Sequence, residues 1–124
     1  MTRLAPVARG VPRPLVSVRH SSPTRGEPIP AYVIAAGSVT NPDAYAEYAK
    51  LAAPAIQQHG GRYLVRGGKL EVLEGAWPHA RTVVVEFASA EQANAFYRSV
   101  EYQAARAKRL GAADFNMIVV EGTA

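Results

Sequence analysis

Apolar residues follow two different periods along residues 30–122, and the alternation between the two periods predicts the order of the secondary-structure elements. Apolar residues at successive or alternate positions predict strands, whereas apolar residues three and four positions apart predict helices. Helices are predicted after the first strand and after the fourth, and the five predicted strands cover residues 31–39, 62–66, 69–74, 81–88 and 115–122.

The first predicted helix starts at Pro42, because Asn41 can cap it and a proline at the first helical position loses no hydrogen bond. Pro54 removes one backbone hydrogen bond inside this helix, and Gly60 can take the left-handed conformation that ends it. Residues at helical spacing form one apolar stripe, and we expect its two tyrosines to belong to the core. The stripe consists of Tyr45, Tyr48, Ala52, Ala55 and Ile56.

The stretch GGRYLVRGGKLEVLEG, residues 60–75, has two glycine pairs and invites two interpretations. A phosphate-binding P-loop is excluded by spacing, because Tyr63 replaces its first glycine and Leu70 follows its lysine. We therefore expect a β-hairpin that turns at Gly67 and Gly68. One hairpin face would be apolar, through Tyr63, Val65, Leu70 and Val72. The other would be mixed, with Arg62, Leu64, Arg66, Lys69, Glu71 and Leu73.

The second helical region begins with a capping-box pattern, Ser89 followed three residues later by Gln92. The helix after it is expected to turn Ala93, Phe96 and Tyr97 inward. Ser99 can start a further helical segment over 100–110, which Gly111 would end.

This order of elements predicts an α+β fold, a ferredoxin-like sandwich in which two helices cover one face of an antiparallel sheet. The central strands 31–39, 81–88 and 115–122 are apolar on both sides, so the face without helices would expose an apolar surface. We expect a second copy of the chain to cover it. The result would be a homodimer with two sheets packed face to face around a cavity.

The composition excludes several classes of protein. The absence of cysteine excludes disulfides, thiolate metal sites and cysteine nucleophiles, and it fits a reducing compartment, so we expect a cytoplasmic protein. No apolar run reaches the roughly 20 residues of a membrane span, so no membrane association is expected. The net charge of +4 is carried by residues 1–30, and residues 31–124 are neutral. We therefore expect no nucleic-acid partner, which would need a basic face on the domain.

Residues 1–29 differ in composition from the remainder, with arginines and many prolines that oppose a packed element. We expect a disordered extension, or one translated from a start codon assigned too far upstream. An organelle transit peptide is an alternative, and a secretory signal is disfavoured because no apolar core segment is present. The folded domain is expected to occupy residues 30–124.

Several motifs of the chain resemble one known family. They are the GGR-x-LVRGG stretch with the LEG that follows, the EF before Ser89, and the S-x-EY helix with Arg-Leu at its end. Together they resemble the domain-of-unknown-function family 1330, DUF1330, over about residues 30–122. The resemblance implies a dimeric α+β barrel and no established activity. Relatives on this barrel include cofactor-independent oxygenases, isomerases, haem-degrading enzymes and ligand binders, and fold alone does not choose among them.

Three charged residues of the predicted strands have both a structural and a functional interpretation. Arg66 can form an ion pair with Glu71 across the turn, or together with Arg62 it can clamp a carboxylate or phosphate. Glu86, within the apolar strand VVVEF, is either a salt-bridge partner of an arginine or a general base with a raised pKa.

Tyr102, Arg106 and Arg109 share one helical face. The two arginines can complement the helix dipole, or they can line a pocket for an anion beside the tyrosine. His59 and His79 have no ligand spacing, so no metal site and no cofactor are expected.

We thus expect a domain that binds a small anionic metabolite or acts on it as a cofactor-independent enzyme, with Glu86 and Tyr102 as catalytic residues and Arg62, Arg66, Arg106 and Arg109 as ligand-binding residues. The alternative is a non-catalytic homodimeric binding or interaction module in which these charges are structural.

Overall fold

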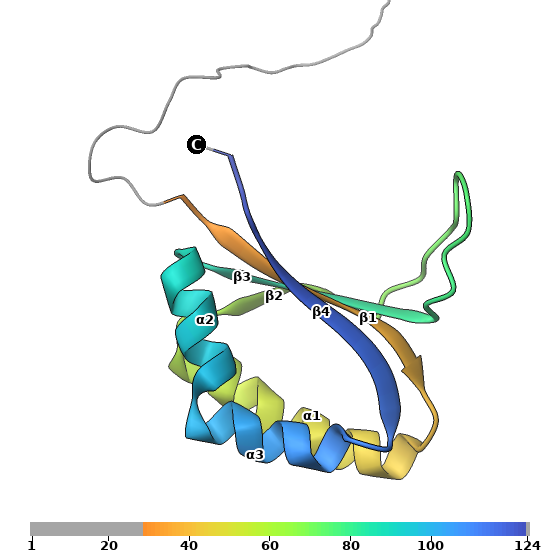
Figure 1. Ribbon diagram of the computed structural model, residues 1–124, viewed down its shortest axis with the longest axis horizontal. Helices are drawn as coiled ribbons and strands as arrows, with labels where there is room; N and C mark the ends of the chain where they lie inside the picture. Colours follow the sequence, from red (N-terminus) through yellow and green to blue (C-terminus); the bar gives the residue numbers. More distant parts are fainter. Residues whose placement is uncertain (1–28, 124) are drawn as a thin grey trace, which may run out of the picture.

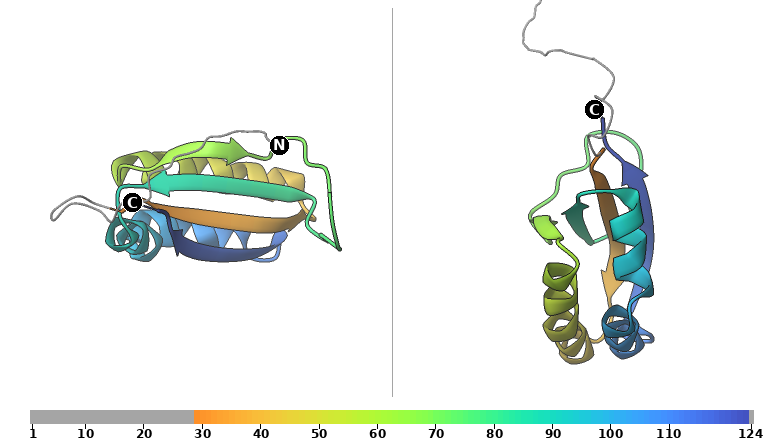
Figure 2. Two further views of the ribbon diagram at one scale, coloured as in Figure 1. Left: turned by 90° about the horizontal axis from the view of Figure 1, so that it is seen from above. Right: turned by 90° about the vertical axis from the view of Figure 1, so that its left-hand side faces the viewer.

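The computed structural model describes residues 29–123 of the chain. Four strands form one antiparallel sheet in the order β2-β3-β1-β4, and three helices lie on one of its faces (Figures 1 and 2). This is the predicted ferredoxin-like α+β sandwich. Its elements are β1 (Ala31–Val39), α1 (Pro42–Gln58), β2 (Arg62–Arg66), β3 (Arg81–Phe87), α2 (Ala90–Arg98), α3 (Val100–Arg109) and β4 (Ala113–Glu121).

Side-chain caps start all three helices where the sequence predicts them. Asn41 Oδ1 accepts a hydrogen bond from the Ala44 N–H, and Ser89 Oγ accepts one from the Gln92 N–H, each at 3.1 Å. The capping box is only half formed, because the Gln92 side chain donates instead to the His59 carbonyl at 2.8 Å. That bond ties the start of α2 to the end of α1.

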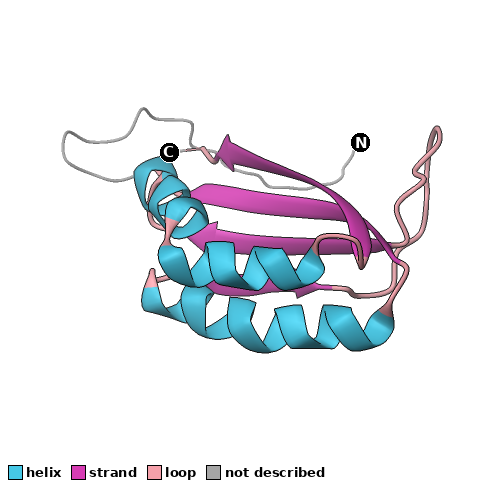
Figure 3. Ribbon diagram, turned by 60° about the horizontal axis from the view of Figure 1, so that its bottom comes forward, coloured by secondary structure: helices cyan, strands magenta, loops and turns pink. Residues whose placement is uncertain are grey.

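The predicted second helical region divides at Ser99, which has extended backbone angles and caps α3 by accepting from the Tyr102 N–H at 3.1 Å. The break changes the direction of the chain. As a result α3 lies beside α1 across the sheet, whereas α2 lies near one end of it (Figure 3).

The core fills the space between the sheet and the helices. Phe87 and Tyr102 are its largest fully buried side chains, each 1 % exposed. Small residues, Ala52, Ala55 and Ala105, are buried between α1 and α3 and let the two helices approach closely. The stripe predicted for the first helix is confirmed, since Tyr48, Ala52, Ala55 and Ile56 are buried and Tyr45 packs against them.

The predicted hairpin over 62–74 is wrong. Strand β2 pairs with β3, and residues 69–74 lie in neither a helix nor a strand. A tight hairpin turn of the expected kind needs positive φ at both central residues, but only Gly67 has it, at 72°. The Gly67 N–H donates to the Thr82 carbonyl at 2.9 Å, which leaves residues 68–80 as a long connection that projects from the sheet (Figure 1).

A β-bulge in β2 decides which face of the sheet Arg66 occupies. Arg62 lies opposite Glu86 and Tyr63 opposite Val85, but the register then shifts, so that Val65 lies opposite Val84 and Arg66 opposite Val83. An extra residue in one strand reverses the facing of every residue that follows. Arg62 and Arg66, predicted to share a face, therefore lie on opposite faces, and Arg66 joins Tyr63 on the helix side.

Candidate functional site

A small cavity lies between the sheet and the helices within the single chain, with a volume of about 40 Å³. Its walls are mostly apolar and include Val33, Val83, Ile56, Phe96 and Met117. Its polar lining comes from Arg66, Arg81 and the tyrosines Tyr45, Tyr48, Tyr63 and Tyr102. The expected cavity lay between two sheets, so this cavity is on the opposite side of the sheet from the predicted one.

Arg66 and Arg81 bring two guanidinium groups to this cavity, each against an aromatic ring. The Arg66 Cζ lies 4.3 Å from the centroid of the Tyr63 ring, and the Arg81 Cζ lies 5.3 Å from that of Tyr45. Arg81 Nε also donates a hydrogen bond to the Tyr45 hydroxyl at 3.0 Å. The rings hold both guanidiniums by cation–π contact, and most of their N–H donors have no partner among residues 29–123.

Neither guanidinium has a carboxylate partner among residues 29–123. The ion pairs in this part of the chain are Lys50 with Glu47 and Arg62 with Glu86. The predicted pair between Arg66 and Glu71 does not form, because the bulge turns Arg66 to the helix side. Two guanidiniums at one apolar cavity, with no acid between them among the described residues, can bind an anion.

Gly67 leaves room for one of these guanidiniums. A Cβ at Gly67 would overlap with Nη1 of Arg81. The positive φ that turns the chain after β2 thus occurs at the residue whose missing side chain makes space for Arg81.

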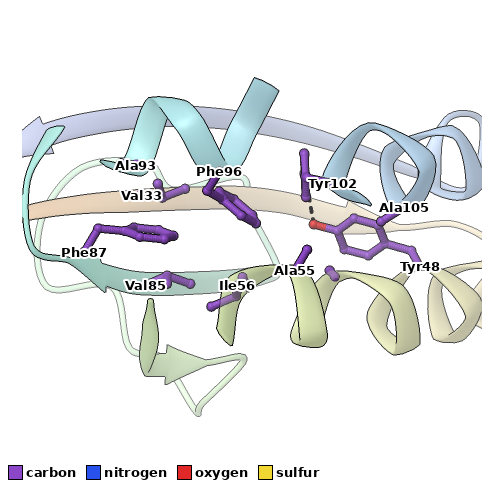
Figure 4. Close-up of a cluster of buried hydrophobic side chains, with 11 residues drawn as sticks. Val33, Tyr48, Ala55, Ile56, Val85, Phe87, Ala93, Phe96, Tyr102 and Ala105 are labelled. Carbon is purple, nitrogen blue, oxygen red and sulfur yellow. Dashed lines mark hydrogen bonds between the residues drawn. The ribbon is translucent and has the colours of Figure 1, made fainter. Parts of the chain in front are cut away.

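A hydrogen-bonded chain of three residues extends from the cavity wall into the core (Figure 4 shows its two tyrosines). The hydroxyls of Tyr48 and Tyr102 are 3.1 Å apart, and Arg109 Nη2 donates to the Tyr102 hydroxyl at 3.5 Å. Tyr102 also donates weakly to the Met117 sulfur at 3.9 Å. Because sulfur only accepts, Tyr48 is then the donor in the tyrosine pair.

Arg109 is buried, with 6 % of its surface exposed, between the rings of Tyr48 and Phe115 at 5.3 and 5.5 Å. Its Nε has no hydrogen-bond partner among the described residues. Burial works against its charge, but the interactions with Tyr102 and Tyr48 outweigh burial and raise the pKa of Arg109. A charged group this deep in the core is not the exposed dipole complement that the sequence suggested.

Burial also raises the pKa of two of the tyrosines. It raises the pKa of Tyr48 far above its ordinary range, with a further contribution from Tyr102. It raises the pKa of Tyr63 as well, against the opposing charge of Arg66. Both phenols therefore remain protonated near neutral pH and act as neutral hydrogen-bonding groups in the cavity wall.

Glu86 lies on the other face of the sheet. Its Oε1 accepts from Arg62 Nε at 2.8 Å, and its Oε2 accepts weakly from the Tyr32 hydroxyl at 3.5 Å. The salt-bridge interpretation of Glu86 is therefore confirmed. Glu86 and Arg62, predicted as site residues together with Arg66 and Tyr102, do not line the cavity, because sheet pairing places both on the other face.

Arg106 lies apart from the cavity as well. It lines a surface hollow of about 370 Å³ at the C-terminal end of α3, together with Arg109 and Asp114. Of the six predicted site residues, only Arg66 and Tyr102 line the cavity itself. Within residues 29–123 no group of three or more histidine, aspartate or glutamate side chains could hold a metal.

Sequence reasoning missed Arg81, Tyr45 and Tyr63 as site residues. The apolar pattern assigns the tyrosines to the core, and Arg81 only marks the start of a strand. A usable signal was present: Arg81 is the first residue of a strand whose alternate residues Val83, Val85 and Phe87 face the helices. Its side chain must therefore share their face.

The model of the DUF1330 family, a domain of unknown function, matches residues 30–123. The chain belongs to the DUF1330 family. The resemblance found in the sequence motifs is thereby confirmed. A search of the curated proteins finds no significant match.

Solved structures similar to this DUF1330 chain share its fold. A protein of unknown function from Rhodopseudomonas palustris, RPA0582, is 22 % identical, with a TM-score of 0.57 over 77 % of this chain and 84 % of that chain. SnoaB, a cofactor-independent oxygenase from Streptomyces nogalater, is 5 % identical, with a TM-score of 0.54 over 73 % and 90 %. A putative antibiotic biosynthesis monooxygenase from Caulobacter crescentus is 16 % identical, with a TM-score of 0.52 over 79 % and 93 %. At these identities the likeness establishes the fold alone.

No helix in the described residues is long and apolar enough to cross a membrane.

Proposed function

We propose that this DUF1330 protein binds a small anionic molecule with a flat apolar body, held in the cavity between the sheet and α1. One observation carries the proposal: Arg66 and Arg81, from neighbouring strands, stand at one apolar cavity with no carboxylate partner among residues 29–123. The anionic group would bind the free N–H donors of the two guanidiniums, and the apolar body would lie against Tyr45, Tyr63 and Val83.

The size of the cavity constrains how such a molecule enters. At about 40 Å³ it holds only a few water molecules. Entry therefore requires Arg66 to leave the Tyr63 ring or Arg81 to leave the Tyr45 hydroxyl. Arg66 is exposed and its contact is a single cation–π pair, so its displacement is the less costly of the two.

A thermal-shift screen with aromatic carboxylates and the neutral methyl ester of each tests this proposal. The acids are expected to raise the melting temperature and the esters are not. The shift should disappear in Arg66→Ala and Arg81→Ala and persist in Arg98→Ala, a matched loss of one exposed arginine on α2. Equal shifts for acid and ester, or an unchanged shift in Arg66→Ala, would contradict the assignment.

A second candidate, a cofactor-independent enzyme acting on such a molecule, is favoured by the chain of Arg109, Tyr102 and Tyr48. Both phenols reach the cavity wall, and Arg109 donates to Tyr102 from behind. A phenol placed in this way can hydrogen-bond an oxygen on which negative charge develops, as on an enolate. No carboxylate among residues 29–123 lines the cavity, so solvent would take the proton from the activated carbon of the bound ligand and, in D2O, return a deuteron to it. This exchange, lost in Tyr102→Phe with binding retained, is the expected signature. Exchange that is unaffected by Tyr102→Phe would contradict the enzymatic role, and ligand binding would remain as the only proposed function.

We also propose that the chain forms a homodimer through the sheet face that lacks helices, here called the open face. Ile34, Val84, Ile118 and Val120 give this face an apolar component, and Ile118 is 56 % exposed. Polar residues share it, among them Thr82, Glu86 and Asn116, so its surface is mixed rather than wholly apolar. Obligate and weaker interfaces both combine an apolar centre with polar neighbours.

Sedimentation velocity at micromolar concentration checks the dimer. The wild-type chain is expected to sediment as a dimer and Ile118→Asp as a monomer. Leu110→Asp is the matched control, since Leu110 has the same exposed fraction of 56 % but lies at the end of α3. A wild-type monomer, or dimers in both variants, would contradict an interface on the open face.

A further inference from the structure

Residues 68–80, here called the arm, carry an apolar surface that is exposed among the residues that the structure describes. Leu70, Val72, Leu73 and Trp77 are exposed by 39, 47, 89 and 48 %. None of the arm lies in a helix or a strand, although Lys69, Leu70, Glu71 and Val72 alternate as in a half-buried strand. Four large exposed apolar side chains in so short a segment indicate that the arm meets a partner.

The arm rises from the sheet on the side away from the helices (Figure 1). Together with the open face it encloses a groove of about 490 Å³. Val65 and Thr82 contribute the sheet wall of this groove, and Leu70, Val72 and Trp77 contribute its arm wall. Anything that covers the open face near β2 must therefore also contact the arm.

A second copy of the chain supplies a surface of matching chemistry. The groove lies at the β2 side of the sheet, and β4 forms the opposite edge. At the middle of β4, Ile118 is paired with Ile34 and is 56 % exposed on the open face. If the two-fold axis runs along the strands between two stacked sheets, it exchanges these edges, and β4 of each copy would face the groove of the other.

We infer that the arm of each copy closes over β4 of a second copy, with Ile118 seated in the groove against Leu70 and Trp77. This inference rests on the proposed dimer through the open face, and it adds that the arm is the segment that contacts β4 of the partner. It also accounts for the failed hairpin prediction. The strand-like pattern of residues 69–74 is satisfied between chains instead of within one.

Trp77 is the single tryptophan of the chain, so its fluorescence reports the state of the arm without labelling. In the wild-type dimer we expect blue-shifted emission and acrylamide quenching several-fold weaker than in monomeric Ile118→Asp. A dimer by sedimentation whose Trp77 is quenched as readily as in Ile118→Asp overturns the arm contact but leaves the open-face dimer standing. A wild-type monomer overturns both.

The absence of cysteine permits a second, position-specific measurement. Chains with Leu70→Cys and chains with Ile118→Cys, carrying different tags, are mixed, unfolded, refolded together and oxidised. A disulfide between the two differently tagged chains is expected, since residues whose side chains touch can bring their Cα atoms within the roughly 7 Å that a disulfide spans. Leu110→Cys mixed with Leu70→Cys is the control and should give no mixed disulfide. Equal yields from both mixtures would overturn the proposed contact.

Discussion

The phenol oxygens of Tyr48 and Tyr102 lie 3.1 Å apart in the core, joining α1 to α3 across 54 residues of sequence. Arg109 donates to the same Tyr102 hydroxyl at 3.5 Å, so a cation, two phenols and the cavity form one connected unit. A buried polar network of this kind fixes the relative position of the two helices, because each member loses a partner if they slide. The same atoms that organise the core also provide the hydrogen-bonding wall of the proposed ligand site.

Replacing Tyr48 by phenylalanine should change how stability depends on alkaline pH. The folded pKa of Tyr48 is raised from its ordinary value of 10.0, so folding retains a proton that the unfolded chain loses. Its contribution to stability is therefore complete below pH 10 and declines as the pH rises further. Above that point the wild-type free energy of unfolding should fall by about 1.4 kcal/mol per pH unit more steeply than that of Tyr48→Phe. Urea denaturation between neutral and strongly alkaline pH measures the two curves; parallel curves would contradict the shift.

Replacing Arg109 by methionine should cost less stability than replacing it by alanine. Methionine fills a similar volume and packs well between Tyr48 and Phe115, so this variant loses the hydrogen bond to the Tyr102 hydroxyl but keeps most of the packing. The free energy of unfolding of Arg109→Met, measured by chemical denaturation, should lie between the values of the wild type and of Arg109→Ala. Arg109→Ala should lose at least about 2 kcal/mol through the cavity it leaves. Equal losses in the two variants would contradict a packing role for the Arg109 side chain.

The two adjacent glycines at the end of β2 offer a matched pair of substitutions. Gly67→Ala places a side chain at a φ of 72° and in overlap with the Arg81 guanidinium, so a loss of about 1–2 kcal/mol is expected. The displaced Arg81 should also bind anionic ligands more weakly. Gly68→Ala meets no atom within 4 Å and should change stability by less than about 0.5 kcal/mol. Similar effects of both substitutions would show that this turn does not position Arg81.

Much of the fold could be predicted because its signals are local. Asn41, Ser89 and Ser99 each cap the helix that follows them, since a short polar side chain satisfies N–H groups only three residues away. The stripe through Tyr48 and Ile56 depends only on helical periodicity. The order of strands and helices, and with it the ferredoxin-like topology, follows from such signals together with the rules that limit how strands connect.

The candidate site was predicted only in part, because its geometry depends on pairing between distant segments. Arg66 and Tyr102 were identified, but Glu86 and Arg62 were grouped with them although they lie on the other face. Arg81 was missed although it lies beside Arg66. The residues of β2 do not by themselves predict the bulge, because it is a shift in the register between β2 and β3.

The sequence by itself determined the helices, their caps, the family and the topology, since each depends on residues close together in the chain or on a pattern that repeats along it. The tertiary structure alone decided that Arg66 joins Arg81 at the cavity, that Arg109 is buried beside Tyr102, and that residues 69–74 leave the sheet. These outcomes follow from strand register and from which surfaces remain available for packing. Both are properties of the whole assembly of elements and not of any one of them.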